Sequence, residues 1–371
     1  MTFQRTRTIL EGLSGCRIDA SQNNRLSASG DVREFHSQAG LDATFELAAF
    51  HAILGPLPVV IHLIIIIRSG NLTIGIRLTL TLAFVLSGAK SAYPQLGMFS
   101  TEQRITLTRE WKGERFPDGR PRVPDSVLAG LKDVDAEEAL EELSIHGYEA
   151  QFEGGWREVN PGGRMVRRVF TAVFMPLRPD INAVINDHGK AEGLVGAQNT
   201  WPIDLLSPGD VLVVDIFGKI KEGTFAGDKL STAIFAKSQN GLVVNGAVRS
   251  ATNISELRGM HVFVRDFDPS ALSDSMLMAI NVPIRIGRTT VLPGDVAVSD
   301  VEGITFIPPQ FAQDVADFSR MIQRIDDWGH QMLREGRYGP GQIDGEWSKQ
   351  MIHEYNLWLE QKGLKERMPE K

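Results

Sequence analysis

Asp228 and Arg249 are the two residues of this 371-residue sequence whose types and surroundings best suit chemistry. Asp228 opens a segment with helical spacing, directly after Gly227, and Arg249 follows a short apolar strand. Arginine side chains and helix N-termini both bind carboxylates and other small anions. In open α/β sheets, ligands bind beyond the carboxyl ends of strands. The sequence therefore predicts a ligand site around this pair.

The elements that must position the pair are two strands and the helix between them. Residues 211–217 form a nearly unbroken apolar run, which is typical of a strand buried on both faces. Gly218 and Gly223 are predicted to end this strand, and residues 230–237 have helical apolar spacing. Residues 242–244 are predicted to form a second short strand, closed by a turn at the Asn-Gly pair that follows.

Several motifs occur in one order along this part of the chain. Together they resemble the RraA-like family, which includes class II, metal-dependent 4-hydroxy-4-methyl-2-oxoglutarate aldolases and the regulator of ribonuclease E activity. The similarity covers residues 192–309 and continues, in a longer subgroup, over residues 98–358. The motifs that carry it are GDVLVVD (209–215), GTFAGDKLSTA (223–233), NGAVR (245–249), NVPIRIG (281–287), VLPGDVAVSD (291–300) and EGITFIP (302–308).

The resemblance implies a fold and an activity. The implied fold is α/β, a layered β/β/α core of the swivelling-domain type, assembled into trimers or hexamers with active sites between subunits. The implied activity is cleavage of a 4-hydroxy-2-oxo acid, or decarboxylation of oxaloacetate, through a pyruvate enolate. Such a reaction needs a cation for the enolate oxygen, a clamp for the carboxylate and a base for the hydroxyl. Mg²⁺ would supply the first of these.

The resemblance also assigns roles to individual residues. Asp228 matches the acidic residue that holds the metal through water, and Arg249 matches the arginine that binds pyruvate and stabilises the enolate. Gly227, Lys229 and Leu230 match positions that bind substrate. A helix cap remains the alternative for Asp228, and a surface ion pair for Arg249. Their separation of 21 residues is the family spacing.

Ser250 departs from the family pattern. It occupies the position of the aspartate that binds the metal directly, and a neutral hydroxyl is a far poorer Mg²⁺ ligand than a carboxylate. Lys229 also replaces the usual asparagine and adds a positive charge. Two interpretations follow: Lys229 partly replaces the cation in a metal-free or altered reaction, or the chain is a non-catalytic binding or regulatory member of the family.

Composition excludes several other classes of function. The formal charge is −7, and the first 97 residues hold 8 Lys and Arg against 6 Asp and Glu, so the acidic excess lies in the remainder. Such a chain carries no basic surface for nucleic acid. Cys16 is the only cysteine, so a disulfide framework is excluded. No P-loop, dinucleotide glycine pattern, HExxH or GxSxG motif occurs.

We divide the chain into four parts. Residues 1–97 are a poorly defined extension, residues 98–180 an arm with helices, residues 181–335 the RraA-like core, and residues 336–371 a helical tail. Within residues 135–146, the carboxylates of Glu137, Glu138, Glu141 and Glu142 fall at helical spacing. We interpret them as a solvated helix face and not as a metal cluster.

The extension contains a signal-like segment at residues 77–92. A basic residue, a short apolar stretch and then small residues is the layout of an export signal, which predicts a periplasmic protein. The alternatives are a buried helix or translated upstream sequence, with the protein then cytoplasmic. Export would separate the chain from ribonuclease E, so we do not expect that partner.

Overall fold

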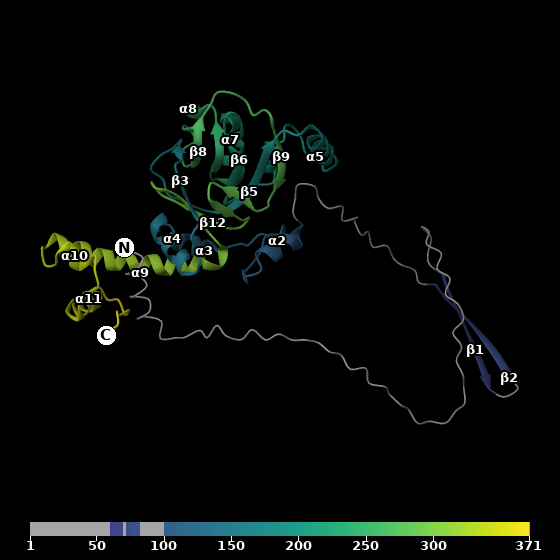
Figure 1. Cartoon of the computed structure of the whole chain (residues 1–371), viewed down its shortest axis with the longest axis horizontal. Coiled ribbons are helices and arrows are strands. Elements are labelled where there is room, and N and C mark those ends of the chain that lie inside the picture. The colour runs from purple at the N-terminus through teal and green to yellow at the C-terminus, as the bar shows by residue number, and fades with distance from the viewer. Residues whose placement is uncertain (1–59, 70–71, 82–99, 371) are drawn as a thin grey trace. The chain divides into compact units, whose positions relative to one another are not determined.

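The computed structural model describes residues 60–69, 72–81 and 100–370 (Figure 1). The chain divides into two compact units. The described part of the first is an antiparallel hairpin of β1 (Val60–Ser69) and β2 (Leu72–Thr81). The signal-like segment is therefore strand up to residue 81, and its remainder lies outside the described residues. Among the described residues, no helix is both long and apolar enough to cross a membrane.

The second unit is built on a mixed nine-stranded sheet (Figure 1). Its middle is parallel, with neighbouring strands β5 (Met165–Pro176), β6 (Asp210–Ala226), β7 (Leu242–Val248) and β8 (Val262–Phe267). The remaining strands pair antiparallel with these or with each other; they are β3 (Phe152–Gly154), β4 (Arg157–Glu158), β9 (Ser275–Ile280), β12 (Val296–Ser299) and β13 (Gly303–Ile307). The sheet thus begins before residue 181, where we placed the start of the core.

Each face of the sheet is covered by a different layer. Along β6, Leu212 and Val214 face one core and Val211 and Val213 the other, because successive strand residues point to opposite faces. Four helices cover the first face: α5 (Pro179–Ala191), α6 (Trp201–Asp204), α7 (Asp228–Ser238) and α8 (Ala251–Ile254). The hairpin of β10 (Ile284–Ile286) and β11 (Thr289–Val291) covers the second. The predicted layered α/β fold is confirmed.

The predicted ends of β6 and β7 are wrong. β6 pairs regularly with β7 as far as Asp215. Beyond that residue the pairing continues with shifts of register, and its last pair is Ala226 with Val248. The residues between bulge out of the ladder, with Gly218 at a φ of 73°. Gly223 packs so closely on this bulge that a Cβ there would lie 1.9 Å from the Lys219 carbonyl oxygen. The glycines therefore bend the strand and do not end it. The Asn-Gly pair of β7 likewise lies within the strand.

A further helical group packs on the other end of the sheet. It consists of α3 (Asp125–Gly130), α4 (Ala136–Ile145) and α9 (Ala312–Arg334), which bury apolar side chains against β5, β12 and β13. The solvated-face interpretation of α4 is wrong for Glu138 and Glu142, which are buried. Glu138 accepts a hydrogen bond from Ser319 Oγ on α9 (2.6 Å). Burial raises the pKa of both carboxyls above the ordinary value.

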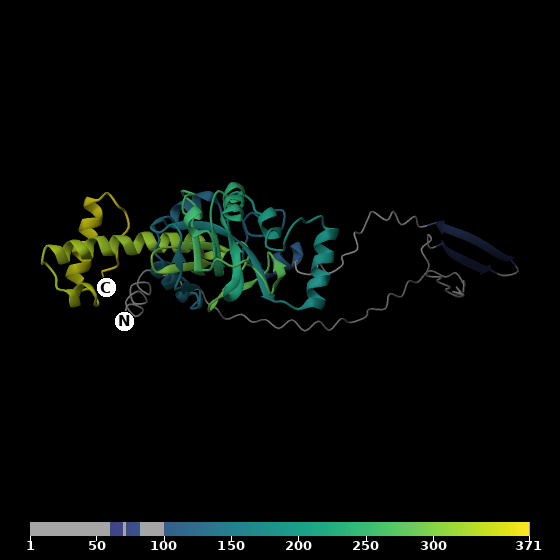
Figure 2. The ribbon, with the colours of Figure 1, turned by 90° about the horizontal axis from the view of Figure 1, so that it is seen from above.

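The tail packs on the far half of α9. The short helix α10 (Pro340–Ile343) and the helix α11 (Lys349–Gln361) fold back on α9 beyond the sheet, as Figure 2 shows. An aromatic cluster joins them: the ring of Trp328 lies 4.6 Å from that of Trp347 and 5.8 Å from that of Tyr355, centroid to centroid. The predicted helical tail is thus attached to the core through one long helix.

A buried ion pair holds the arm before α3 onto the sheet. This arm begins with α2 (Thr101–Leu107). The guanidinium of Arg120 donates to Asp210 at the start of β6 (3.0 Å) and to Asp118 (2.7 Å). Arg120 and Asp210 are 1% and 0% exposed, so neither charge is solvated by water. The arm is therefore an integral part of the fold.

We expect Arg120→Ala to lower the free energy of unfolding by about 3–5 kcal/mol, because it leaves Asp210 as an uncompensated buried charge. The measurement is the urea midpoint of the full chain. Arg109→Ala is the control, since Arg109 is an arm arginine whose side chain is 79% exposed. Equal midpoints for the two variants would show that the pair does not anchor the arm.

Candidate functional site

All six residues predicted for the site line one open cavity of about 780 Å³. The turn between β6 and α7 supplies Gly227, Asp228, Lys229 and Leu230. Arg249 and Ser250 follow the last residue of β7, beside that turn. Because β6 and β7 are parallel neighbours, their carboxyl ends meet at the same edge of the sheet. The strand–helix–strand unit thus brings the pair together.

Arg249 lies against the start of α7 without a charged partner. Its backbone N–H donates to the Ala226 carbonyl (3.1 Å), which ties the two strand ends together. A Cβ on Gly227 would lie 3.1 Å from Arg249 Nε, so the absence of a side chain there leaves room for the guanidinium. Among the described residues, no carboxylate forms an ion pair with Arg249. The surface ion pair considered above is therefore not observed.

Asp228 is the first residue of α7 and not its cap. The capping position belongs to Gly227, without a side-chain capping bond. The half-buried carboxylate of Asp228 accepts one long hydrogen bond, from Asn253 Nδ2 (3.5 Å). The N–H groups of residues 228–230 precede the first helical bond, which Ser231 donates to the Gly227 carbonyl (2.9 Å). They are free to bind an anion, and the helix dipole favours negative charge there.

The donors present do not fit a resident divalent cation. Asp228 is the only carboxylate among the residues that line the cavity, and Ser250 adds one hydroxyl. Groups of three or more His, Cys, Asp or Glu suited to a metal do not occur anywhere in the described part of the chain. The two cationic side chains of the lining, Lys229 and Arg249, further disfavour a metal and favour an anion.

A cluster of three side-chain amides in the same cavity lining was not predicted from the sequence. Gln198 accepts from the Leu277 N–H (2.7 Å), which directs its Nε2 at the carbonyl oxygens of Asn182 (2.7 Å) and Asn186 (2.9 Å). Since both Oδ1 atoms accept from Gln198 and neither Nδ2 group has a partner among the described residues, both Nδ2 groups are available as donors. The one sequence signal was the i, i+4 spacing of the two asparagines on α5.

The comparison with protein families now identifies this part of the chain. The model described as "RraA-like: Aldolase/RraA" matches residues 137–306. Residues 137–306 are therefore similar to the RraA-like family. The matched residues include the ends of β6 and β7, just beyond which Asp228 and Arg249 lie, and also β3 to β5.

Similar proteins extend the comparison beyond the family model. A proposed 4-hydroxy-4-methyl-2-oxoglutarate aldolase of Halalkalibacterium halodurans is 32% identical over 121 residues. That match covers 33% of this chain and 57% of the relative, so the chain spans little more than half of that protein's length.

Among solved structures, an uncharacterised protein of Pseudomonas syringae pv. tomato is 22% identical, with a TM-score of 0.49, over 61% of this chain and 100% of that one. Streptomyces coelicolor RraAS2, described as an unusual member of the RNase ES inhibitor RraA protein family, is 25% identical. Its TM-score is also 0.49, over 57% of this chain and 99% of that one.

Proposed function

We propose that the chain is a carbon–carbon lyase that releases pyruvate from a small 2-oxo acid. The observation that carries this proposal is Arg249, which forms no ion pair with any described residue and lies against the free N–H groups of an 11-residue helix. A planar guanidinium and a helix N-terminus together bind a carboxylate and stabilise a neighbouring oxyanion. A 2-oxo acid carries its carboxylate directly beside the carbonyl oxygen that becomes the enolate oxyanion, so one small group could occupy both binding positions.

The bond-breaking step then needs few groups. In oxaloacetate, the bond between C3 and C4 breaks, CO₂ leaves, and the electron pair forms an enolate whose oxygen Arg249 stabilises. A proton then adds at C3 to give pyruvate. In a 4-hydroxy-2-oxo acid, a base must first remove the hydroxyl proton. Asp228 is the only carboxylate of the lining and is our candidate for this base.

The amide cluster offers such a substrate further hydrogen-bond donors. The Nδ2 groups of Asn182 and Asn186 are hydrogen-bond donors in the lining of the same cavity as Arg249. A second carboxylate or a hydroxyl on the substrate would accept hydrogen bonds there. We infer that a 2-oxo dicarboxylic acid is preferred over a 2-oxo monocarboxylic acid.

Mg²⁺ is the cofactor that the family resemblance implies, and it remains a prediction for this chain. Because the donors at Asp228 and Ser250 do not fit a resident cation, we derive no step through a metal. Lys229 lies one residue along α7 and supplies positive charge to the same cavity. A trimer or hexamer, export to the periplasm and the absence of ribonuclease E binding also remain predictions.

A non-catalytic binding protein is the second candidate, and the observation that favours it is Ser250. If the missing aspartate is indispensable, the same cavity still binds a carboxylate through Arg249 and the α7 N-terminus. In that case 2-oxo acids bind to the chain but are not cleaved.

Pyruvate release by the full chain tests the proposal. We would offer oxaloacetate and 4-hydroxy-4-methyl-2-oxoglutarate with Mg²⁺ and with a chelator, and subtract the rate without protein at the same Mg²⁺ concentration. We expect release that persists in the chelator. Release that vanishes with the chelator would instead support a metal site despite Ser250. Absence of release together with binding of pyruvate would establish the second candidate.

A further inference from the structure

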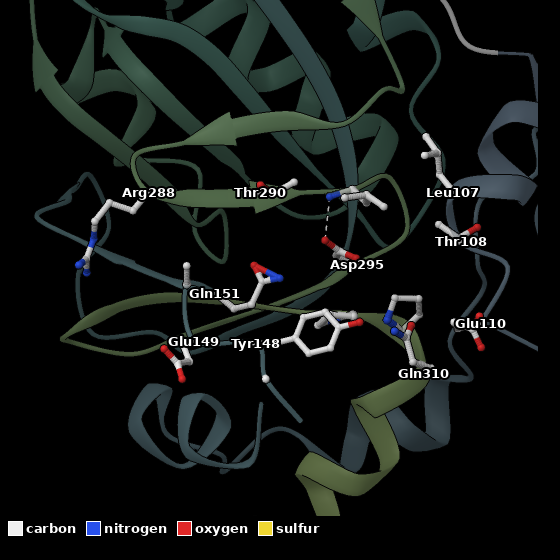
Figure 3. A pocket seen from close by; sticks show the side chains of 15 residues that line it. Leu107, Thr108, Glu110, Tyr148, Glu149, Gln151, Arg288, Thr290, Asp295 and Gln310 are labelled. Atoms are coloured by element: carbon white, nitrogen blue, oxygen red, sulfur yellow. Dashed lines mark hydrogen bonds between the residues drawn. The ribbon is translucent and has the colours of Figure 1, made fainter. Parts of the chain in front are cut away.

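A second cavity, of about 490 Å³, lies away from the Asp228–Arg249 site and shares none of its residues. Figure 3 shows its lining from close by. Five segments far apart in the sequence meet there: the end of α2, the loop between α4 and β3, the β10–β11 hairpin, the turn before β12, and the prolines ahead of α9. Leu292, Pro308, Pro309 and the ring of Tyr148 supply apolar walls.

The side-chain carbonyl oxygen of Gln151, a residue of this lining, has no hydrogen-bond partner among the described residues. The residue is only 9% exposed, and its Oε1 is buried with no hydrogen-bond donor among the described residues. Its backbone carbonyl is held by the Phe306 N–H (2.8 Å), which places the side chain firmly. An unpaired buried acceptor costs free energy, about 1–3 kcal/mol. A ligand with an N–H donor would remove that cost.

Asp295 presents a second polar group to the same space. It is 3% exposed, and its Oδ2 accepts from the Leu292 N–H (2.7 Å). Burial raises the pKa of its carboxyl to about 8, and only the bond from Leu292 opposes this. Figure 3 shows the Gln151 amide and the Asp295 carboxyl turned toward the same space above the Tyr148 ring. Within the described part of the chain, the carboxyl thus lacks the counter-charge that a buried carboxylate requires.

The other charges of the lining favour a cation. Glu110 and Glu149 are exposed carboxylates at its margin, and Arg288 is the one cationic side chain among the lining residues. Arg288 is exposed and lies at the opposite end of the cavity from Asp295, as Figure 3 shows. Along its lining, this cavity therefore presents three carboxyl groups against one guanidinium.

We propose that this second cavity binds a small organic cation, a primary ammonium or guanidinium compound, through Asp295 and Gln151. The charged group pairs with the Asp295 carboxylate and donates to Gln151 Oε1. Its hydrocarbon part lies along Tyr148, Pro308 and Leu292. The proposal does not depend on the reaction at Arg249.

The ionisation of Asp295 sets the sign of the pH dependence. A cation binds the ionised carboxylate, which is the minor form below a pKa of about 8. Binding therefore releases a proton at neutral pH, and affinity rises with pH until the carboxyl is ionised. Alkylammonium groups ionise near 10.4 and stay charged in this range. Affinity should be roughly a hundredfold lower at about pH 6 than at about pH 9.

Calorimetric titration of the full chain with n-butylamine tests the proposal, and n-butanol is the neutral probe of similar shape. We expect binding of the ammonium with the stated pH dependence, and none of the alcohol. Equal binding of both probes, binding that does not vary with pH, or no binding of the amine would each overturn the proposal.

Asp295→Asn is the decisive variant, because its amide oxygen still accepts from the Leu292 N–H while the charge is removed. It should fold with an unchanged urea midpoint and lose the pH-dependent binding. Gln151→Leu should weaken butylammonium by about fivefold. If Asp295→Asn binds the amine as the unmodified chain does, Asp295 only closes its turn and the proposal fails.

Discussion

Arg249→Ala should lower kcat/KM for pyruvate release by about 10²–10³, the range found when one donor to a developing oxyanion is removed. The guanidinium has no carboxylate partner among the described residues, so its removal leaves no buried charge unpaired and should not unfold the chain. The loss should therefore appear in kcat as well as in KM, since an enolate exists only after the carbon–carbon bond begins to break.

Two matched variants separate charge from geometry. Arg249→Lys keeps the charge but lacks the planar fork, and should recover only part of the rate. Arg258→Ala removes an exposed arginine that follows α8 and lies outside the cavity lining, and should leave the rate unchanged. If Arg249→Ala and Arg258→Ala retain equal activity, Arg249 is not the enolate-stabilising residue.

Ser250→Asp is expected to give the site a dependence on Mg²⁺ that the unmodified chain lacks. The new carboxylate would lie beside that of Asp228 and complete the two-carboxylate arrangement that Mg²⁺ accepts. Ser250 has φ 56° and ψ 36°, a left-handed conformation that aspartate adopts more readily than most residues. Mg²⁺ should then accelerate pyruvate release by at least about tenfold, because a metal ion contributes several kcal/mol to an enolate-like transition state.

Ser250→Asn is the control of equal size without charge, and it should gain no response to Mg²⁺. The measurement is the rate of pyruvate release across a Mg²⁺ titration, with Mg²⁺ binding followed separately by calorimetry. Adding Lys229→Asn to Ser250→Asp should strengthen Mg²⁺ binding further, since a like charge next to the site is removed. Failure of Ser250→Asp to bind Mg²⁺ would show that Ser250 is not at a former metal position.

The predictions for Arg249→Ala and Ser250→Asp can fail independently of each other. Arg249→Ala is informative only if the unmodified chain releases pyruvate. Ser250→Asp is informative in either case. A chain that binds 2-oxo acids without cleaving them, and gains activity with Ser250→Asp and Mg²⁺, would be a binding protein derived from a lyase site.

The sequence by itself determined the strand–helix–strand unit and the approach of Asp228 to Arg249. These are local consequences of a parallel βαβ connection, in which a helix begins where one strand ends and the next strand ends at the same edge. It also indicated the resemblance to the RraA-like family, which the family model matches over residues 137–306, because several motifs in one order carry more information than any single one. Ser250 and Lys229 were recognised as departures from the family pattern because the surrounding motifs fixed their positions in it.

Only the tertiary structure decided where strands end and which charges are buried. Gly218 and Gly223 read as strand ends, but pairing with β7 resumes beyond them, and pairing between distant segments is not visible in local sequence. Glu138 and Glu142 were predicted to be solvated because helical spacing does not show which other element will pack on a helix face. In the structure, α9 packs on the face that carries them. The cavity at Gln151 and Asp295 joins five segments up to about 200 residues apart. Its ligand groups became visible only once those segments were brought together.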